Sequence, residues 1–160
     1  MIPSLAGKLR APGMLGLVAF ALCALAKDSA PTFHVTSIVL KQDGRLDNVV
    51  LQQCDVARIV ADSVQRFQAK HRKKGGPTTD LTLRIDRVAR VGGTYSGGDF
   101  GGTDLGVTLL SAGNRRTNQP FFCRANGFKA IRNPSHCERL DYCGEKIAEQ
   151  MSTWLSWQAP

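Results

Sequence analysis

Two segments of the chain carry apolar residues at the three- and four-residue spacing of an amphipathic helix. The first begins near Cys54–Asp55 and ends in the basic run 70–74, just before Gly75-Gly76-Pro77. Its apolar positions are Val56, Ile59, Val60, Val64 and Phe67. The second closes the chain, with apolar positions Leu140, Cys143, Ile147, Met151, Trp154 and Leu155. Ser135 and Glu138 have the spacing of a capping box at its start.

Four other segments indicate strands. Residues 33–41 are rich in β-branched side chains, and residues 81–91 alternate between apolar and polar positions. In the second of these, the apolar phase can continue through Ala89 and Val91, with Arg87 as the one exception. Residues 105–111 and 120–132 complete the set, with turns predicted at 42–45 and 112–116. Residues 46–53 fit neither the three- and four-residue spacing of a helix nor the alternation of a strand.

This order of elements is β-α-β-β-β-α. Consecutive strands followed by a helix favour antiparallel pairing, with the helices gathered on one face. We therefore predict an α+β fold, a two-layer sandwich in which both helices cover one face of an antiparallel sheet.

Residues 1–26 have the pattern of an export signal. Lys8 and Arg10 precede an apolar run over 14–25, and Ala24-Leu25-Ala26 fits a signal-peptidase site before Lys27. The run is shorter than the ~20 apolar residues that cross a membrane. We therefore expect a single exported domain over residues 27–160, periplasmic or secreted, with no transmembrane segment after cleavage.

The expected exported domain keeps four cysteines. An even number in an oxidising compartment predicts two disulfides, and the sequence leaves their pairing open among Cys54, Cys123, Cys137 and Cys143. Zinc is the alternative, because Cys123, Cys137 and Cys143 are close in sequence to His136. However, none of them forms the tight C-x-x-C pair usual at such sites. Lipidation of Cys23 is disfavoured, since Leu22 stands where a bacterial lipobox has a small residue.

Positive charge is the main clue to a partner. The 21 Lys and Arg of the chain, less Lys8 and Arg10, leave 19 against 13 Asp and Glu, a net charge of +6. Such a domain suits an acidic protein, an anionic lipid or an acidic glycan. A nucleic acid is not expected, because the signal implies export and no recognition motif is present. The densest basic cluster is Lys70, Arg72, Lys73 and Lys74.

The segment 92–106 contains three Gly-Gly pairs, with Tyr95 and Phe100 between them. It has neither phosphate-binding nor dinucleotide-binding glycine spacing, so no nucleotide cofactor is predicted. We expect a long hairpin loop there, whose two aromatic side chains contact a partner. Asp99 and Asp104 share the segment and form the carboxylate pair that a small hydrolase would need.

Nothing else in the sequence supports catalysis. The motifs G-x-S-x-G, H-E-x-x-H and C-x-x-C are absent, and the histidines are His34, His71 and His136. We therefore predict a protein that is not an enzyme and carries no metal or cofactor.

The order of these elements also resembles that of a known type of protein. The signal is followed by a strand, a helix and a run of strands in which residues 105–113 (LGVTLLSAG) lead into 121–125 (FFCRA). A last helix with residues 145–151 (EKIAEQM) closes the chain. This arrangement resembles small bacterial envelope accessory proteins, such as auxiliary lipoproteins of ABC-type envelope transporters and the lipopolysaccharide-assembly lipoproteins. The missing lipobox departs from them, and no functional residue carries over.

Together these patterns predict a non-enzymatic periplasmic accessory protein that binds an envelope partner, either a protein or an anionic lipid. The alternative is a secreted effector or inhibitor that engages its target through the Gly-rich segment 92–106. The sequence indicates no oligomeric state.

Overall fold

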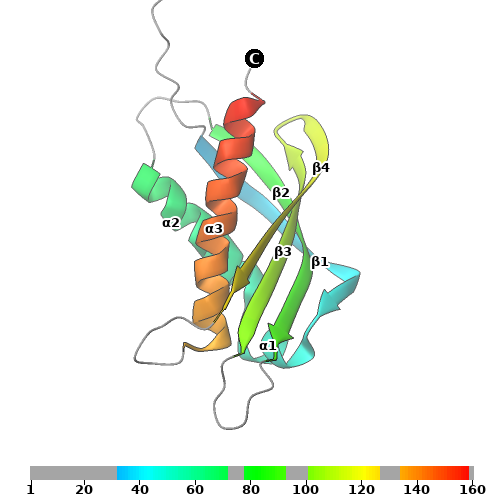
Figure 1. Ribbon diagram of the computed structural model, residues 1–160. Helices are drawn as coiled ribbons and strands as arrows, with labels where there is room; N and C mark the ends of the chain where they lie inside the picture. Colours follow the sequence, from blue (N-terminus) through cyan, green and yellow to red (C-terminus); the bar gives the residue numbers. More distant parts are fainter. Residues whose placement is uncertain (1–31, 72–77, 93–100, 127–133, 159–160) are drawn as a thin grey trace, which may run out of the picture.

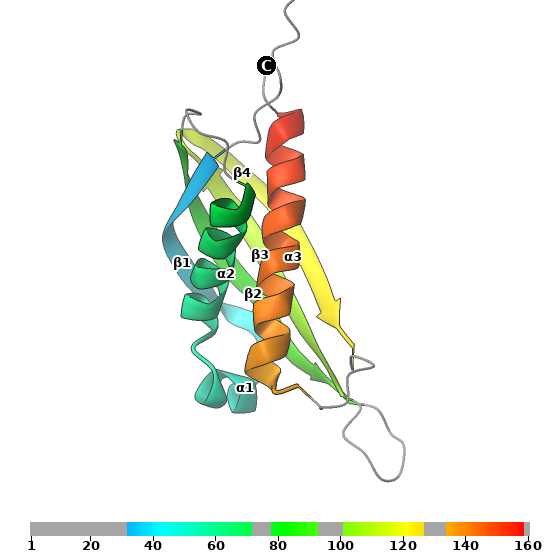
Figure 2. The same cartoon turned by 90° about the vertical axis from the view of Figure 1, so that its left-hand side faces the viewer.

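The computed structural model describes residues 32–71, 78–92, 101–126 and 134–158 (Figure 1). In this part of the chain α2 and α3 lie side by side against one face of a four-stranded sheet (Figure 2). The predicted α+β class, in two layers with these helices on one face, is confirmed. The elements are β1 (Thr32–Leu46), α1 (Asn48–Gln53), α2 (Val56–His71), β2 (Thr78–Val91), β3 (Gly102–Ala112), β4 (Arg115–Ala125) and α3 (His136–Trp157).

The sheet is mixed, so the expectation of an antiparallel sheet is wrong for one pair. The spatial order is β1-β2-β3-β4, and β1 pairs with β2 in parallel while the other two pairs are antiparallel. The cause is the connection between β1 and β2. It contains α2, which returns the chain across the sheet so that β2 starts at the same end as β1.

The first strand is longer than predicted and includes the residues expected to form a turn at 42–45. β1 continues to Leu46, with a break in its register to β2 between Leu40 and Arg45. The ambiguous segment that follows contains the short helix α1, whose N-cap is Asp47. Asp47 Oδ1 accepts hydrogen bonds from the backbone N–H groups of Val49 (2.9 Å) and Val50 (3.3 Å).

The second strand changes phase at its middle. Leu81, Leu83 and Ile85 face the helices, as predicted, but the register to β3 then shifts between Ile85 and Arg87. After this bulge, Val88 is the fully buried residue and Ala89 is only half-buried. The prediction that the apolar phase runs on to Ala89 is therefore wrong, because a bulge inserts one residue against its partner strand.

The long loop predicted at 92–106 is wrong for residues 102–106, because β3 begins at Gly102 and residues 103–106 pair with both neighbouring strands. β4 also differs from its predicted bounds. β4 begins at Arg115 rather than 120 and ends at Ala125, and residues 127–133 lie outside the described residues. The capping box at the start of α3 is confirmed. Ser135 Oγ accepts from the Glu138 backbone N–H at 3.2 Å, and Glu138 Oε2 accepts from the Ser135 N–H at 2.8 Å.

Two disulfides join the layers. Cys54–Cys137 links the residue between α1 and α2 to the first turn of α3, with Cα atoms 5.5 Å apart. Cys123–Cys143 links β4 to α3, with Cα atoms 5.4 Å apart. The prediction of two disulfides is confirmed, and the zinc alternative is wrong because all four sulfur atoms are covalently paired.

The two long helices approach closely at Gly144. A Cβ added there would lie 2.6 Å from the Ser63 Cβ and 2.5 Å from its Oγ. Ser63 is fully buried, and its hydroxyl donates to the Ile59 carbonyl at 2.6 Å, so it has little room to move. The absence of a side chain at 144 therefore sets the distance between α2 and α3.

Substituting Gly144→Ala is expected to lower the free energy of unfolding by about 1–2 kcal/mol. Overpacking against Ser63 outweighs the roughly 1 kcal/mol gain in helix propensity. Urea denaturation checks this as a lower midpoint with an unchanged m-value. The matched control is Gly92→Ala, where an added Cβ meets nothing within 4 Å. Equal or greater stability for Gly144→Ala would contradict the close approach.

Candidate functional site

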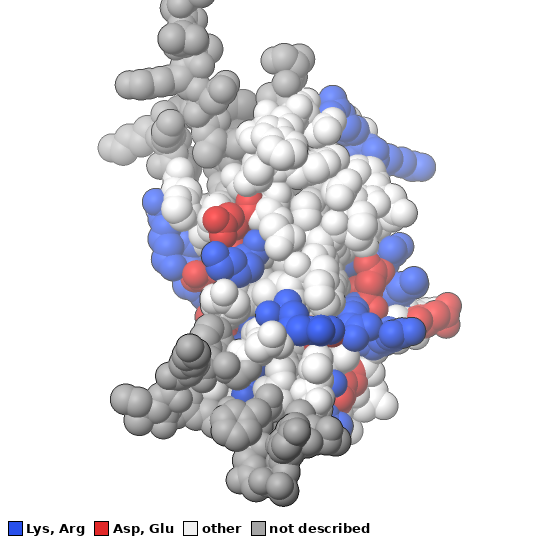
Figure 3. Space-filling view, in the orientation of Figure 1, with Lys and Arg blue, Asp and Glu red and all other residues white. Residues whose placement is uncertain are grey.

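No described helix covers the face of the sheet that points away from α2 and α3 (Figure 2). Polar side chains of β2, β3 and β4 meet there across the strands. Lys and Arg crowd the right-hand side of Figure 3, interspersed with Asp and Glu. We call this surface the arginine face and define it by Arg84, Asp86, Arg87, Asp104, Thr108, Phe122 and Arg124.

Asp104 is the centre of this surface. Its carboxylate has no solvent exposure, and two arginines from the neighbouring strands donate to it. Arg124 Nε lies 2.7 Å from Oδ1, and Arg124 Nη2 lies 3.0 Å from Oδ2. Arg87 Nε and Nη2 lie 3.1 and 2.8 Å from Oδ2. These four charge-assisted hydrogen bonds fix the planes of both guanidinium groups.

The same contacts determine the protonation of Asp104. The hydrogen bonds from Arg124, followed by those from Arg87, hold the pKa of its carboxyl below the ordinary value despite the opposing effect of burial. Asp104 is therefore held in its ionised form by the two arginines. In this form Asp104 is poorly suited to act as a general acid, which must first be protonated. Its suggested partner, Asp99, lies outside the described residues.

A second carboxylate orients the third arginine. Arg84 Nε donates to Asp86 Oδ1 at 2.6 Å, and the hydroxyl of the buried Thr108 donates to Asp86 Oδ2. Arg84 and Asp86 are two residues apart on one strand, so their side chains share a face. The sequence pattern is sufficient to place this pair.

Two local features bring Arg87 to Asp104. The bulge in β2 turns Arg87 toward the open face, opposite Gly106 on β3. A Cβ at Gly106 would lie 3.0 Å from the Arg87 Cβ, so a larger residue there would press on the arginine. The missing side chain leaves room for the Arg87 stem to lie across β3.

Counting contacts among the described residues alone, the three guanidinium groups keep N–H groups available for a partner. Each has five N–H donors, and the carboxylates take only part of them. The Arg84, Arg87 and Arg124 side chains are 30%, 30% and 47% exposed. Beside them the exposed Phe122 ring has its centroid 5.9 Å from Arg124 Cζ. The arginine face therefore has three positive side chains and two negative ones. Its net positive charge suits a carboxylate or phosphate group of a partner.

The basic cluster predicted at 70–74 is described only at Lys70. Its Nζ lies 2.9 Å from Glu145 Oε1. The hydrogen bond from Lys70 is the main cause that lowers the Glu145 pKa, and nearby Arg66 adds to it. Lys70 thus links α2 to α3 on the helix layer, away from the arginine face. Arg72, Lys73, Lys74, Tyr95 and Phe100 lie outside the described residues, so their predicted partner contacts stay predictions.

Within the described ranges, no group of three or more His, Cys, Asp or Glu side chains could hold a metal ion. Nor is any helix among these residues long and apolar enough to cross a membrane. His136 Nδ1 lies 3.0 Å from the Thr103 hydroxyl.

Nine chains of solved structures are similar in fold to this chain, two bacterial proteins among them. A protein of Caulobacter crescentus CB15 described as a lipoprotein has a TM-score of 0.40 and 11% identity, covering 79% of this chain and 93% of its own. A minor lipoprotein of Acinetobacter baumannii has a TM-score of 0.37 and 12% identity, covering 76% and 93%. No protein-family model and no curated protein match the sequence. At these TM-scores neither likeness assigns a role to this chain.

Proposed function

We propose that this chain is a non-enzymatic accessory protein of the bacterial envelope that binds the acidic surface of a partner protein through the arginine face. The observation that carries the proposal is the buried Asp104 carboxylate, which holds Arg87 and Arg124 in place while part of each guanidinium stays exposed. The envelope location rests on the predicted signal at residues 1–26, and the two disulfides are compatible with it.

Fixed arginines favour a protein partner over a lipid surface. Attraction to a membrane needs only positive charge, which mobile lysines also supply. Here the guanidinium planes are set by carboxylates and lie beside the exposed Phe122. Arginine and aromatic side chains are the residue types enriched in protein interfaces, and a planar fork matches a carboxylate at a defined position.

The test removes charge from this face while Asp104 keeps Arg87. Immobilised wild-type protein is expected to capture an acidic partner from an envelope extract. The Arg84→Gln/Arg124→Gln variant, immobilised in the same way, is expected not to capture it. The captured protein is identified by mass spectrometry and rebound in purified form at low and high salt. Phe122→Ala is expected to weaken binding without lowering thermal stability, because its ring is 47% exposed.

Arg58→Gln/Lys146→Gln is the matched control, since it removes two exposed charges from the helix layer. Capture that is lost equally in both double variants would mean general charge attraction and would reject the arginine face. Sedimentation with phosphatidylglycerol vesicles is the second arm. Binding of wild-type protein to these vesicles alone, abolished by Arg84→Gln/Arg124→Gln, would replace the protein partner by an anionic lipid.

A further inference from the structure

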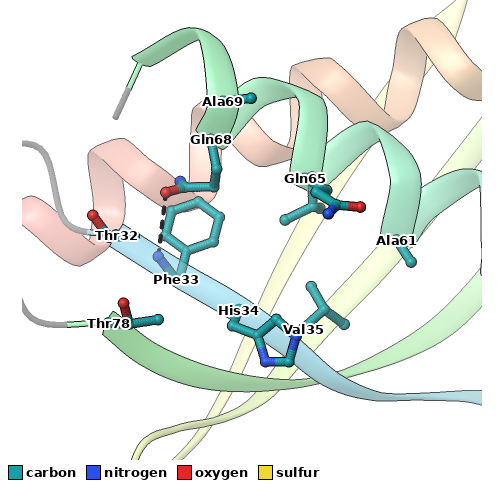
Figure 4. A pocket seen from close by; sticks show the side chains of 10 residues that line it. Thr32, Phe33, His34, Val35, Ala61, Gln65, Gln68, Ala69 and Thr78 are labelled. Carbon is teal, nitrogen blue, oxygen red and sulfur yellow. Dashed lines mark hydrogen bonds between the residues drawn. The ribbon is translucent and has the colours of Figure 1, made fainter. Parts of the chain in front are cut away.

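A cavity of about 440 Å³ lies between the start of β1 and the second half of α2, on the helix side of the sheet. We call it the β1–α2 slot. Figure 4 shows α2 running along β1, with Phe33 of β1 and Gln68 of α2 directed toward one another in the space between them. The arginine face is on the opposite side of the sheet, so the slot is a separate feature. Its volume is in the range of small-molecule sites, about 300–1,000 Å³.

The slot is long and mostly apolar. Phe33 and Val35 line it from β1, and Ala61 and Val64 line it from α2. From Ala61 to Gln68 the helix rises about 10 Å, at ~1.5 Å per residue. From Thr32 to Val35 the strand covers a similar distance, about 10 Å at ~3.3 Å per residue. The small side chain of Ala61 leaves the space open beside Val35 (Figure 4). This shape fits one linear hydrocarbon chain.

One end of the slot is polar. Gln68 points from α2 toward β1, where its Oε1 accepts a hydrogen bond from the Phe33 backbone N–H at 3.2 Å (Figure 4). Gln68 is only 9% exposed, and its Nε2 has no hydrogen-bond partner among the described residues. Thr32, at the same end and 7% exposed, has a hydroxyl with no partner in this part of the chain. Thr78 lies beside them (Figure 4).

A buried hydroxyl without a partner, here that of Thr32, is unfavourable, and a ligand oxygen would satisfy it while the Gln68 amide donates to the same atom. A neutral ligand group is favoured, because none of the described residues that line the slot is Lys, Arg, Asp or Glu, and its one histidine, His34, lies 3.6 Å from the Asp80 carboxylate. A carboxylate or phosphate would enter without a countercharge. An ester or amide carbonyl oxygen accepts two hydrogen bonds without carrying a charge.

We propose that the β1–α2 slot binds a single acyl chain attached through an ester or amide. The carbonyl oxygen accepts from Gln68 Nε2 and from the Thr32 hydroxyl, which turns about its χ1 angle to reach it. The chain then extends along Val35 toward Ala61. The proposal does not depend on a partner at the arginine face.

Two probes of equal chain length test the role of the carbonyl. Lauroyl lysophosphatidylcholine carries an ester carbonyl, whereas its ether analogue, 1-O-dodecyl lysophosphatidylcholine, has the same glycerophosphocholine head group and no carbonyl. Titration calorimetry below the micelle concentration is expected to show about fivefold tighter binding of the ester probe, the value of about one hydrogen bond. Equal affinity for the two probes would overturn the carbonyl contact, and binding of neither would overturn the site.

Two variants locate the binding. Ala61→Leu fills the slot and is expected to abolish binding of both probes, while Lys146→Leu adds the same side chain on the exposed side of α3 and is expected to leave binding unchanged. Thr32→Val removes a hydroxyl that has no partner, so the fold is retained, and it is expected to reduce the preference for the ester. The assignment would be contradicted if the Ala61→Leu variant still bound the probes. It would also be contradicted if the Thr32→Val variant kept the full preference for the ester probe. If Ala61→Leu fails to fold, Thr32→Val and the probe pair still decide the question.

Discussion

Replacing both Cys54 and Cys137 by alanine is expected to lower the free energy of unfolding by about 4 kcal/mol. The bridge joins residues 83 positions apart, and closing a loop of that length removes about 4.5 kcal/mol of chain entropy from the unfolded state. The same relation gives about 3 kcal/mol for Cys123–Cys143, whose residues are 20 positions apart. A loss of this size is a large part of the 5–15 kcal/mol typical of a whole domain.

Urea denaturation of the oxidised wild type and of the alanine variant measures the difference. Ser135→Ala is the control at the same end of α3, since it removes the capping box and leaves the bridge intact. It is expected to cost about 1 kcal/mol. If the free energy of unfolding of the double cysteine variant falls no further than that of Ser135→Ala, the bridge contributes only to the local order of the helix end.

Asp104→Asn is expected to lower the free energy of unfolding by about 2–3 kcal/mol at neutral pH. The amide keeps the shape of the buried side chain but leaves Arg87 and Arg124 without a countercharge. Breaking a buried ion pair costs about 3–5 kcal/mol, and we expect a smaller loss because water reaches both guanidinium groups. Asp80→Asn is the control, because Asp80 is 65% exposed.

The loss in free energy of unfolding caused by Asp104→Asn is also expected to depend on pH. The folded-state pKa of Asp104 is lowered, chiefly by Arg124, so its contribution is fully present above the unfolded pKa of about 3.9. It is lost as the pH falls through the lower folded-state pKa, since both states are then protonated. Unfolding measured at pH 7 and at several values below pH 4 should show the variant approaching the wild type. A difference that stays constant with pH would contradict the ion-pair explanation.

The sequence is sufficient to predict the elements that local patterns determine. The apolar stripes locate α2 and α3, and the spacing of Ser135 and Glu138 identifies the start of the last helix. The alternation at 81–85 locates β2. In each of these cases the signal lies within a few residues, because periodicity and capping are properties of single elements.

The arginine face could not be predicted in the same way, because it depends on register. Asp104 meets Arg124 through the pairing of β3 with β4, and it meets Arg87 only because a bulge shifts β2. The sequence alone pairs Asp104 with Asp99 and assigns the basic site to Lys70 and its neighbours. The parallel pairing of β1 was missed for a related reason, since strand direction follows from the path of α2 between the strands.

The two disulfides also determine the order in which the molecule can be completed. Among the four cysteines from Cys54 onward, the first pairs with the third and the second with the fourth, so neither bridge joins neighbouring cysteines. As the chain emerges from its N-terminal end, Cys123 is the first thiol that Cys54 can meet. Oxidation at that stage forms a non-native link, and reaching the native pairs then requires thiol–disulfide exchange. Where oxidation precedes the arrival of Cys137, the yield of native protein depends on an isomerising thiol as well as on an oxidant.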